Sequence, residues 1–152
     1  MFEQFAGQAR SAVEAALEEA RRRGDRRLST EHLLLGLLHD ENAVEVLGVG
    51  LDQARAGLDE LDREALAVIG IDADGVERPV IQGSAKRTPF TSGARDVLRR
   101  GVLETRAAKE RRIGTSHLLL AVLDTRHPDP AAELIGHLGI DPAAVRERLK
   151  AA

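Results

Sequence analysis

The stretch Thr30-Glu31-His32-Leu33-Leu34-Leu35 returns 85 residues later as Thr115-Ser116-His117-Leu118-Leu119-Leu120. The agreement extends outward from both copies. Between residues 5–38 and residues 90–123 no gap is needed, and 13 of the 34 aligned positions are identical. Chance would give about two identities, and a repeat at a fixed offset indicates two copies of one supersecondary unit that bury their apolar faces together.

Each copy is predicted to start with an amphipathic helix followed by a buried one. Apolar or small residues recur every three to four positions, which is the period of one helix face. The second helix is predicted to begin at Thr30, interpreted as its N-cap, and its twin at Thr115. Leucines surround this second helix, so we expect it to be central and buried. The predicted stripes of the first helices are Phe5, Ala9, Ala12, Val13, Ala16, Leu17 and Ala20, and Phe90, Ala94, Val97, Leu98, Gly101, Val102 and Thr105.

Each copy is then predicted to close with a Gly-apolar-Asp turn into a last helix. These turns are Gly50-Leu51-Asp52 and Gly139-Ile140-Asp141, with the Asp as N-cap and Pro142 at the first helical position. The offset has grown to 89 here, so the second copy has four extra residues near positions 124–130. A third such turn, at residues 70–72, lies in an insertion at about residues 60–88.

Composition excludes several classes of protein. The 152 residues include no cysteine, so disulfides, zinc-thiolate sites and cysteine nucleophiles are ruled out, and a reducing cytoplasm suits the chain. The net charge of −3 and only three aromatic residues argue against a nucleic-acid or membrane-surface binder. No apolar run approaches the roughly 20 residues that span a bilayer.

These motifs together resemble the duplicated N-terminal domain of the Clp chaperone ATPases, most closely the ClpC type. The shared features are a Phe-led helix with Ala-Arg and the Thr-x-His-Leu-Leu-Leu stretch, each present twice at this spacing. The resemblance implies an all-α fold of two pseudo-twofold-related four-helix repeats packed as one domain. Repeat one would cover about residues 2–60 and repeat two about 89–150, and the insertion would add about one helix or a loop.

The resemblance implies a non-catalytic module that binds proteins or peptides, with Clp ATPase or protease components among its partners. Clp proteins carry ATPase modules after this domain, and a P-loop needs Lys directly after Gly. Here Lys86, Lys109 and Lys150 follow Ala, Ala and Leu, so no P-loop is present. Two alternatives stay open, a stand-alone Clp-N protein, which the insertion favours, and the excised front of a ClpC-type unfoldase.

Some family members recognise phosphorylated arginine, and the resemblance implies where such a site would lie. The Glu of Thr-Glu-His would hold the guanidinium, and the start of each repeat's first helix would lie near the phosphate. Repeat one keeps Glu31 but has Ala6 where Thr is common, while repeat two keeps Thr91 but has Ser116 in place of Glu. We expect at most one working site, around Glu31. The alternative is that Glu31 only favours the N-terminal end of its helix.

A second candidate surface is a groove at the paired first helices, which in relatives binds partner proteins and cyclic-peptide antibiotics. Exposed Phe beside Arg is a common composition of binding hot spots. The alternative is that Phe5 and Phe90 are equivalent core residues. The candidate groove residues are Phe2, Arg10, Val13, Phe90 and Arg95.

The two repeated histidines are candidates for a metal site or a hydrolase centre, and neither interpretation is favoured. His32 and His117 have no His, Asp or Glu three or four residues further along, and no HExxH pattern exists. A hydrolase built on His32, Glu31 and Ser116 would lack a nucleophile elbow. We expect histidines bonded to the backbone, no metal, no cofactor and no catalytic residue.

Overall fold

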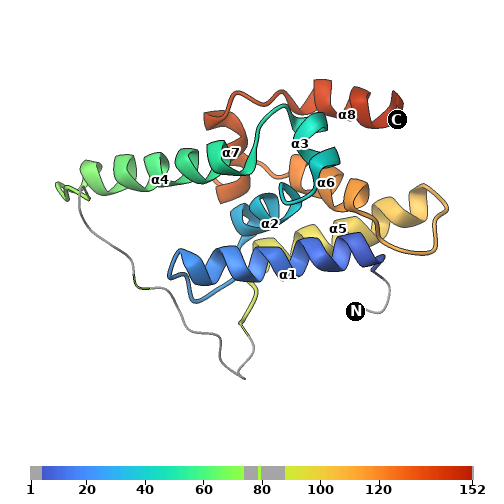
Figure 1. Cartoon of the computed structure of the whole chain (residues 1–152), viewed down its shortest axis with the longest axis horizontal. Helices are drawn as coiled ribbons and strands as arrows, with labels where there is room; N and C mark the ends of the chain where they lie inside the picture. Colours follow the sequence, from blue (N-terminus) through green and yellow to red (C-terminus); the bar gives the residue numbers. More distant parts are fainter. Residues whose placement is uncertain (1–4, 74–78, 80–87, 152) are drawn as a thin grey trace.

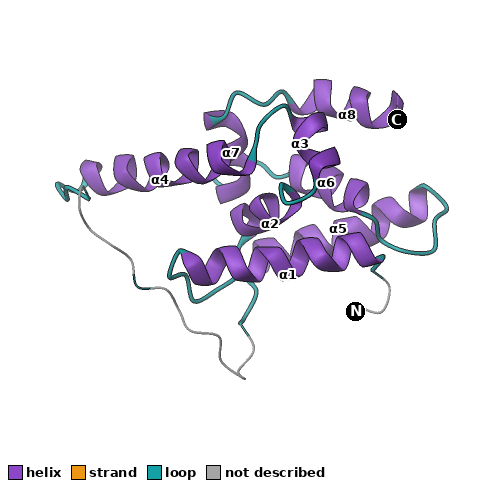
Figure 2. Ribbon diagram, viewed as in Figure 1, coloured by secondary structure: helices purple, strands orange, loops and turns teal. Residues whose placement is uncertain are grey.

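The computed structural model describes residues 5–73, 79 and 88–151, and in this described part the regular elements are eight α-helices without a strand (Figure 2). The all-α prediction is therefore confirmed. Both Thr-x-His-Leu-Leu-Leu stretches begin helices where the sequence placed them, at Thr30 and at Thr115. The helices are α1 (Gly7–Arg22), α2 (Thr30–Leu37), α3 (Glu41–Leu47), α4 (Leu51–Val68), α5 (Ser92–Ala107), α6 (Thr115–Leu123), α7 (Pro130–His137) and α8 (Pro142–Ala151).

The helices form layers around α2 and α6. Helices α1 and α5 run along one side, α2 and α6 lie inside, and α3, α7 and α8 lie on the opposite side (Figure 1). Side chains of α1, α2, α5 and α6 meet around one small interior gap, where Val13 and Val97 face the leucines of the two central helices. Every residue from His32 to Leu38 is buried, as the all-round apolar pattern of α2 predicts.

The two repeats are joined by exchanged segments, each of which precedes the first helix of its repeat. The segment before α1 pairs with the segment before α6, where Ala6 N donates to Ile113 O at 2.9 Å. The segment before α5 pairs with the segment before α2, where Thr91 N donates to Leu28 O, also at 2.9 Å. These two contacts are related by the same offset of 85 residues, so the structure carries the pseudo-twofold relation that the repeat predicts.

The first and second helices of each repeat pack closely through a small residue. In repeat one that residue is Gly36 of α2, where an added Cβ would lie 2.2 Å from Ala12 O and 2.9 Å from Ala16 Cβ. In repeat two the glycine is on the other helix, because Gly101 occupies the position equivalent to Ala16, and Ala121 the position equivalent to Gly36. One glycine for each helix pair is enough to bring the backbones together.

A buried ion pair fastens α4 to α1. Glu19 is 3% exposed, and Arg55 donates to it twice, from Nε to Oε1 at 2.6 Å and from Nη2 to Oε2 at 2.8 Å. Burial raises the pKa of Glu19, but the hydrogen bonds and charge of Arg55, with His39 and Arg22 nearby, outweigh it and lower the pKa below its ordinary value. The same pairing raises the pKa of Arg55. Glu19 is therefore ionised in the folded protein and depends on Arg55.

Some predicted helix boundaries are wrong. The N-cap of α2 is Ser29, and Thr30 is the first helical residue. The N-cap of α4 is Gly50, so Asp52 falls inside the first turn, whereas Asp141 does cap α8, accepting from Ala143 N at 3.1 Å. The sequence motif pairs Gly50 with Gly139, but the structure does not. The glycine with a left-handed backbone is Gly48 in repeat one and Gly139 in repeat two.

The insertion begins as a continuation of α4, which runs to Val68 and extends away from the other helices (Figure 1). The described residues of the insertion thus continue a helix of repeat one and end as a loop, which fits the expected extra helix or loop. Three apolar side chains at the end of the extension are exposed, Val68 (86%), Ile69 (70%) and Ile71 (47%). Residues 74–78 and 80–87 of the insertion lie outside the described residues.

Candidate recognition site at the starts of α2 and α5

The start of α2 is held by a buried histidine. Nδ1 of His32 accepts from Ser29 N at 2.9 Å, which leaves the ring proton on Nε2, where it is donated to Asp25 Oδ2 at 2.8 Å. His117 repeats this arrangement, since its Nδ1 accepts from Gly114 N at 2.8 Å. Both histidines therefore bond to the backbone as predicted. His32 is 1% exposed with both ring nitrogens engaged, so it is not available as a general base.

Glu31 lies beside this histidine with an unsatisfied carboxylate. Its side chain is 12% exposed, and Oε1 lies 3.5 Å from Nδ1 of His32, whose lone pair is already used by Ser29. Oε2 is buried and has no hydrogen-bond partner within the described residues. A buried carboxylate oxygen without a donor is costly, and a cation or hydrogen-bond donor brought by a ligand would satisfy it.

The exchanged segments bring the start of α5 to the start of α2. Thr91 N donates to Leu28 O, and the methyl of Thr30 lies 3.5 Å from the position of a Cβ on Gly93. Thr91 caps α5, accepting from Ala94 N at 3.2 Å. Glu31 is therefore combined with Thr91 of the other repeat and not with Ala6 of its own.

This pairing corrects the assignment by repeat made from the sequence. Because Ala6 N bonds to Ile113 O, Ala6 lies near the start of α6, which carries Ser116. The two favourable residues, Glu31 and Thr91, thus share one location, and the two replaced residues, Ala6 and Ser116, share the other. We call the first location the Glu31–Thr91 site.

A contact that the sequence did not indicate closes one side of this site. The hydroxyl of Thr30, fully buried, donates to Asp129 Oδ1 at 2.6 Å and accepts from Ala131 N at 3.1 Å. Asp129 caps α7, and its Oδ2 lies 3.1 Å from the Cβ position of Gly93 at the start of α5. A carboxylate so placed stabilises the N-terminal end of α5 and favours a cationic group nearby over an anionic one.

The candidate groove residues are only partly on the surface. Arg10 and Arg95 are exposed and Phe90 is half-buried, so these three are accessible at the α1 and α5 side. Val13 is 2% exposed and is a core residue, so it is not a surface contact in this structure. Phe5 is likewise in the core, and Phe90 packs against the core, so the two phenylalanines are only approximately equivalent. Phe2 lies outside the described residues.

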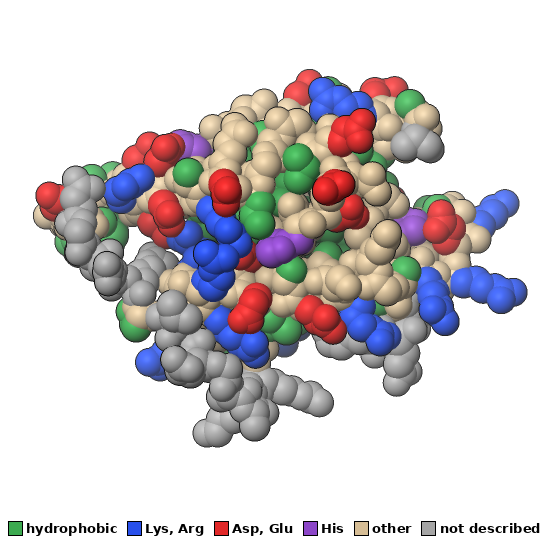
Figure 3. Space-filling view, in the orientation of Figure 1, with side chains coloured by type: hydrophobic (Ala, Val, Ile, Leu, Met, Phe, Trp, Pro, Cys, Tyr) green, Lys and Arg blue, Asp and Glu red, His purple; other side chains and the backbone are tan. Residues whose placement is uncertain are grey.

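Within the described residues, no three His, Asp or Glu side chains gather in an arrangement suited to a metal ion. No helix in the same part of the chain is long and apolar enough to cross a membrane. On the face drawn in Figure 3, basic and acidic side chains are interspersed and do not form one continuous basic surface.

The comparisons with known proteins agree with this architecture. The model of the Clp repeat (R) N-terminal domain family matches residues 4–129, and the chain belongs to this family. It is 29% identical to chaperone protein ClpC1, chloroplastic, of Arabidopsis thaliana, and 32% identical to a probable ATP-dependent Clp protease ATP-binding subunit of Chlamydia pneumoniae. Each alignment covers 98% of this chain but only 15% or 16% of the relative's length.

A solved structure has the same fold. The N-terminal domain of the Caseinolytic protease associated chaperone ClpD from Arabidopsis thaliana superposes with a TM-score of 0.72 at 22% identity. The superposition covers 98% of this chain and 99% of that chain. The duplicated helical architecture expected from the resemblance is therefore confirmed.

Proposed function

We propose that this chain is a non-catalytic recognition module that binds protein segments, and that the Glu31–Thr91 site binds phosphorylated arginine side chains. Its partners would be arginine-phosphorylated proteins or adaptors, together with Clp ATPase or protease components. A cytoplasmic location belongs to the same proposal. The alternative whole-protein role is the N-terminal domain of a ClpC-type ATP-dependent unfoldase, and a reading frame that continues into an ATPase module would establish it.

The observation that carries the phosphoarginine proposal is the unsatisfied Oε2 of Glu31. A guanidinium donates through paired N–H groups, and a carboxylate accepts two of them in one plane. The hydroxyl of Thr91 and the free N–H groups at the first turn of α5 are suited to the phosphate. Asp129 opposes the phosphate, so we expect weak binding, with a dissociation constant in the range of about 10–1,000 μM.

The position equivalent to this site in the other repeat lacks the same chemistry. Ser116 has no charge to offer a guanidinium, and Ala6 has no hydroxyl to offer a phosphate. Loss of a hydrogen-bond partner to a charged group costs about 1.5–3 kcal/mol, or roughly 10- to 150-fold in affinity. With both partners replaced, we expect no measurable binding there.

A second candidate ligand class is the cyclic-peptide antibiotics and partner proteins that relatives bind at the first helices. The half-buried Phe90 and the exposed Arg10 and Arg95, on the α1 and α5 side, support this candidate. Replacement of the exposed Arg10 of α1 by Ala would weaken such a ligand and leave phosphoarginine binding unchanged, so the two candidates can be separated.

The test is calorimetric titration of the chain with phosphoarginine, with arginine and inorganic phosphate as separate ligands. We expect about one equivalent of phosphoarginine to bind and Glu31→Gln to weaken it at least about tenfold. Glu41→Gln, an exposed glutamate at the start of α3, is the matched control and should leave binding unchanged. Absence of heat at millimolar phosphoarginine, or equal binding by Glu31→Gln, would contradict the proposal.

A further inference from the structure

The two repeats form equivalent contacts across the molecule, and one of these contacts is open. On one side the start of α2 meets the start of α7, where the buried Thr30 bonds to Asp129 and Ala131. The equivalent residues on the other side are Thr115 at the start of α6 and Asp40, the N-cap of α3. Thr115 is only half-buried, and in the described part of the chain its hydroxyl makes no hydrogen bond.

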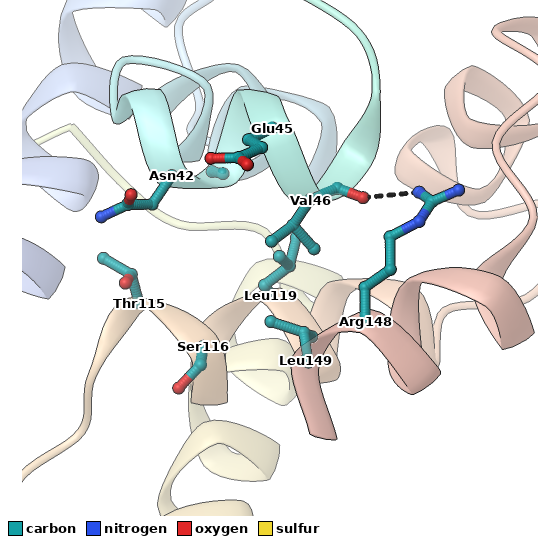
Figure 4. Close-up of a pocket in the computed structure, with 9 residues that line it drawn as sticks. Asn42, Glu45, Val46, Thr115, Ser116, Leu119, Arg148 and Leu149 are labelled. Atoms are coloured by element: carbon teal, nitrogen blue, oxygen red, sulfur yellow. Dashed lines mark hydrogen bonds between the residues drawn. The ribbon is translucent and has the colours of Figure 1, made fainter. Parts of the chain in front are cut away.

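The open contact leaves a cavity of about 600 Å³ between α3, the start of α6 and α8. This volume lies within the range of roughly 300–1,000 Å³ that is typical of ligand pockets. Figure 4 shows the side chains of Val46, Leu119 and Leu149 gathered at its centre, which makes the floor apolar. Val46 and Leu149 belong to the partly buried residues at the edge of the core, so the floor continues into the core.

Polar groups stand at the two ends of this floor. At one end Asn42 and Thr115 lie near one another, and neither side chain has a hydrogen-bond partner within the described residues (Figure 4). At the other end Arg148 rises from α8, and its Nη1 donates to Val46 O at 2.7 Å. Arg148 takes part in no ion pair in the described part of the chain, so its charge is not neutralised by a carboxylate there.

We propose that this cavity, which we call the α3–α6–α8 pocket, binds the C-terminal residue of a protein or peptide when that residue is apolar. The apolar side chain would lie on the floor of Val46, Leu119 and Leu149. The terminal carboxylate would pair with Arg148 at one end of this floor, away from Asn42, Thr115 and the Glu45 carboxylate at the other end.

A chain end fits this pocket better than an internal segment. A free C-terminus carries an apolar side chain and a carboxylate on one residue, and the apolar floor and the Arg148 guanidinium lie within one small cavity.

This pocket is separate from the Glu31–Thr91 site, so each proposal can fail alone. Its floor and charge come from α3, α6 and α8, which contribute no residue to the Glu31–Thr91 site. Glu31→Gln is therefore expected to leave peptide binding unchanged, and Arg148→Gln to leave phosphoarginine binding unchanged.

The test uses methyl NMR, because the chain has no Trp or Tyr for fluorescence. The probe is the acetylated pentapeptide Gly-Ser-Gly-Ser-Leu with a free carboxylate, compared with its C-terminal amide and with a version that ends in Gly. We expect the methyl signals of Val46, Leu119 and Leu149 to shift saturably with the acid. The amide and the Gly version should each bind at least about tenfold more weakly.

Two variants and a control locate the site. Arg148→Gln should weaken the acid about tenfold, and Asn42→Trp, an exposed position at the mouth, should block it. Lys150→Gln removes an equal charge from the same helix outside the pocket and should change binding less than about twofold. Binding of the amide as tightly as the acid, persistence of binding in Asn42→Trp, or no shift at about 5 mM acid would overturn the proposal.

Discussion

Replacement of the Thr30 hydroxyl by a methyl group, in Thr30→Val, tests the asymmetry between the two halves of the molecule. The variant loses a hydrogen bond to the Asp129 carboxylate, which is worth about 1.5–3 kcal/mol. The backbone N–H of Ala131 loses the Thr30 hydroxyl as an acceptor but keeps a second one, Asp129 Oδ1 at 2.9 Å, so this loss destabilises the protein little. The added methyl group is buried in place of the hydroxyl, which stabilises the folded state by up to about 0.8 kcal/mol. We therefore expect a net destabilisation of about 2 kcal/mol.

The matched control is Thr115→Val, the same change at the equivalent position. The Thr115 hydroxyl has no hydrogen-bond partner in the described residues, and Thr and Val have similar helix propensity. The free energy of unfolding should therefore change by less than about 0.5 kcal/mol. Urea unfolding followed by circular dichroism at the helical band gives both free energies. The melting temperature should fall by about 4–8 °C in Thr30→Val.

Equal effects of the two variants would refute this reasoning. If both lost about 2 kcal/mol, Thr115 would have a partner, and the open contact on which the α3–α6–α8 pocket rests would be closed. If neither lost stability, the Thr30–Asp129 bond would contribute nothing measurable, and the starts of α2 and α7 would be held by packing alone.

Two further predictions concern packing and charge. Gly36→Ala should destabilise the protein by about 2–3 kcal/mol although Ala is the better helix former, because the new Cβ would lie 2.2 Å from Ala12 O. The control is Gly136→Ala, whose Cβ would meet nothing within 4 Å. This control should stabilise the protein by up to about 1 kcal/mol in the same urea titrations. Arg55→Met should cost about 3–5 kcal/mol at pH 7, because it leaves the Glu19 charge buried without its partner. The lowered pKa of Glu19 means that its contribution in the wild type is complete above about pH 4.5 and is lost as the pH falls through the folded-state pKa. In the variant burial still raises that pKa, and only the weaker pairing with His39 and Arg22 lowers it, so the decrease in stability towards acid pH should be smaller than in the wild type. A parallel decrease in both proteins would contradict the assignment.

Much of the fold could be predicted from the sequence because the repeat is long and its helical periods are strong. The starts of α2 and α6 follow from duplicated stretches, and the buried stripe of α1 follows from spacing alone. The role of Thr30 could not be predicted, since its partner Asp129 lies 99 residues further along the chain and the equivalent residues, Thr115 and Asp40, form no such bond in the described part of the chain. Thr at a helix start also normally indicates a cap, and here Ser29 occupies that position.

Both residues of the proposed Glu31–Thr91 site follow from the resemblance to Clp N-terminal domains. The sequence assigns them to different repeats, because a repeat read from the sequence is a self-contained unit. The exchange of the segments before α1 and α5 decides the pairing, and short bridges such as that of Leu28 with Phe90 leave no periodic signal in a sequence. The sequence places Val13 both in the buried stripe of α1 and in the surface groove, and its exposure of 2% agrees with the stripe.

The central claim is that Glu31 and Thr91 form one site across the two repeats, and titration of Thr91 variants with phosphoarginine tests it most directly. We expect Thr91→Ala to abolish the same single equivalent that Glu31→Gln abolishes, and Thr91→Ser, which keeps the hydroxyl, to preserve it. The double change Ala6→Thr with Ser116→Glu should create a second equivalent. Unchanged binding in Thr91→Ala, with the single site still dependent on Glu31, would contradict the claim.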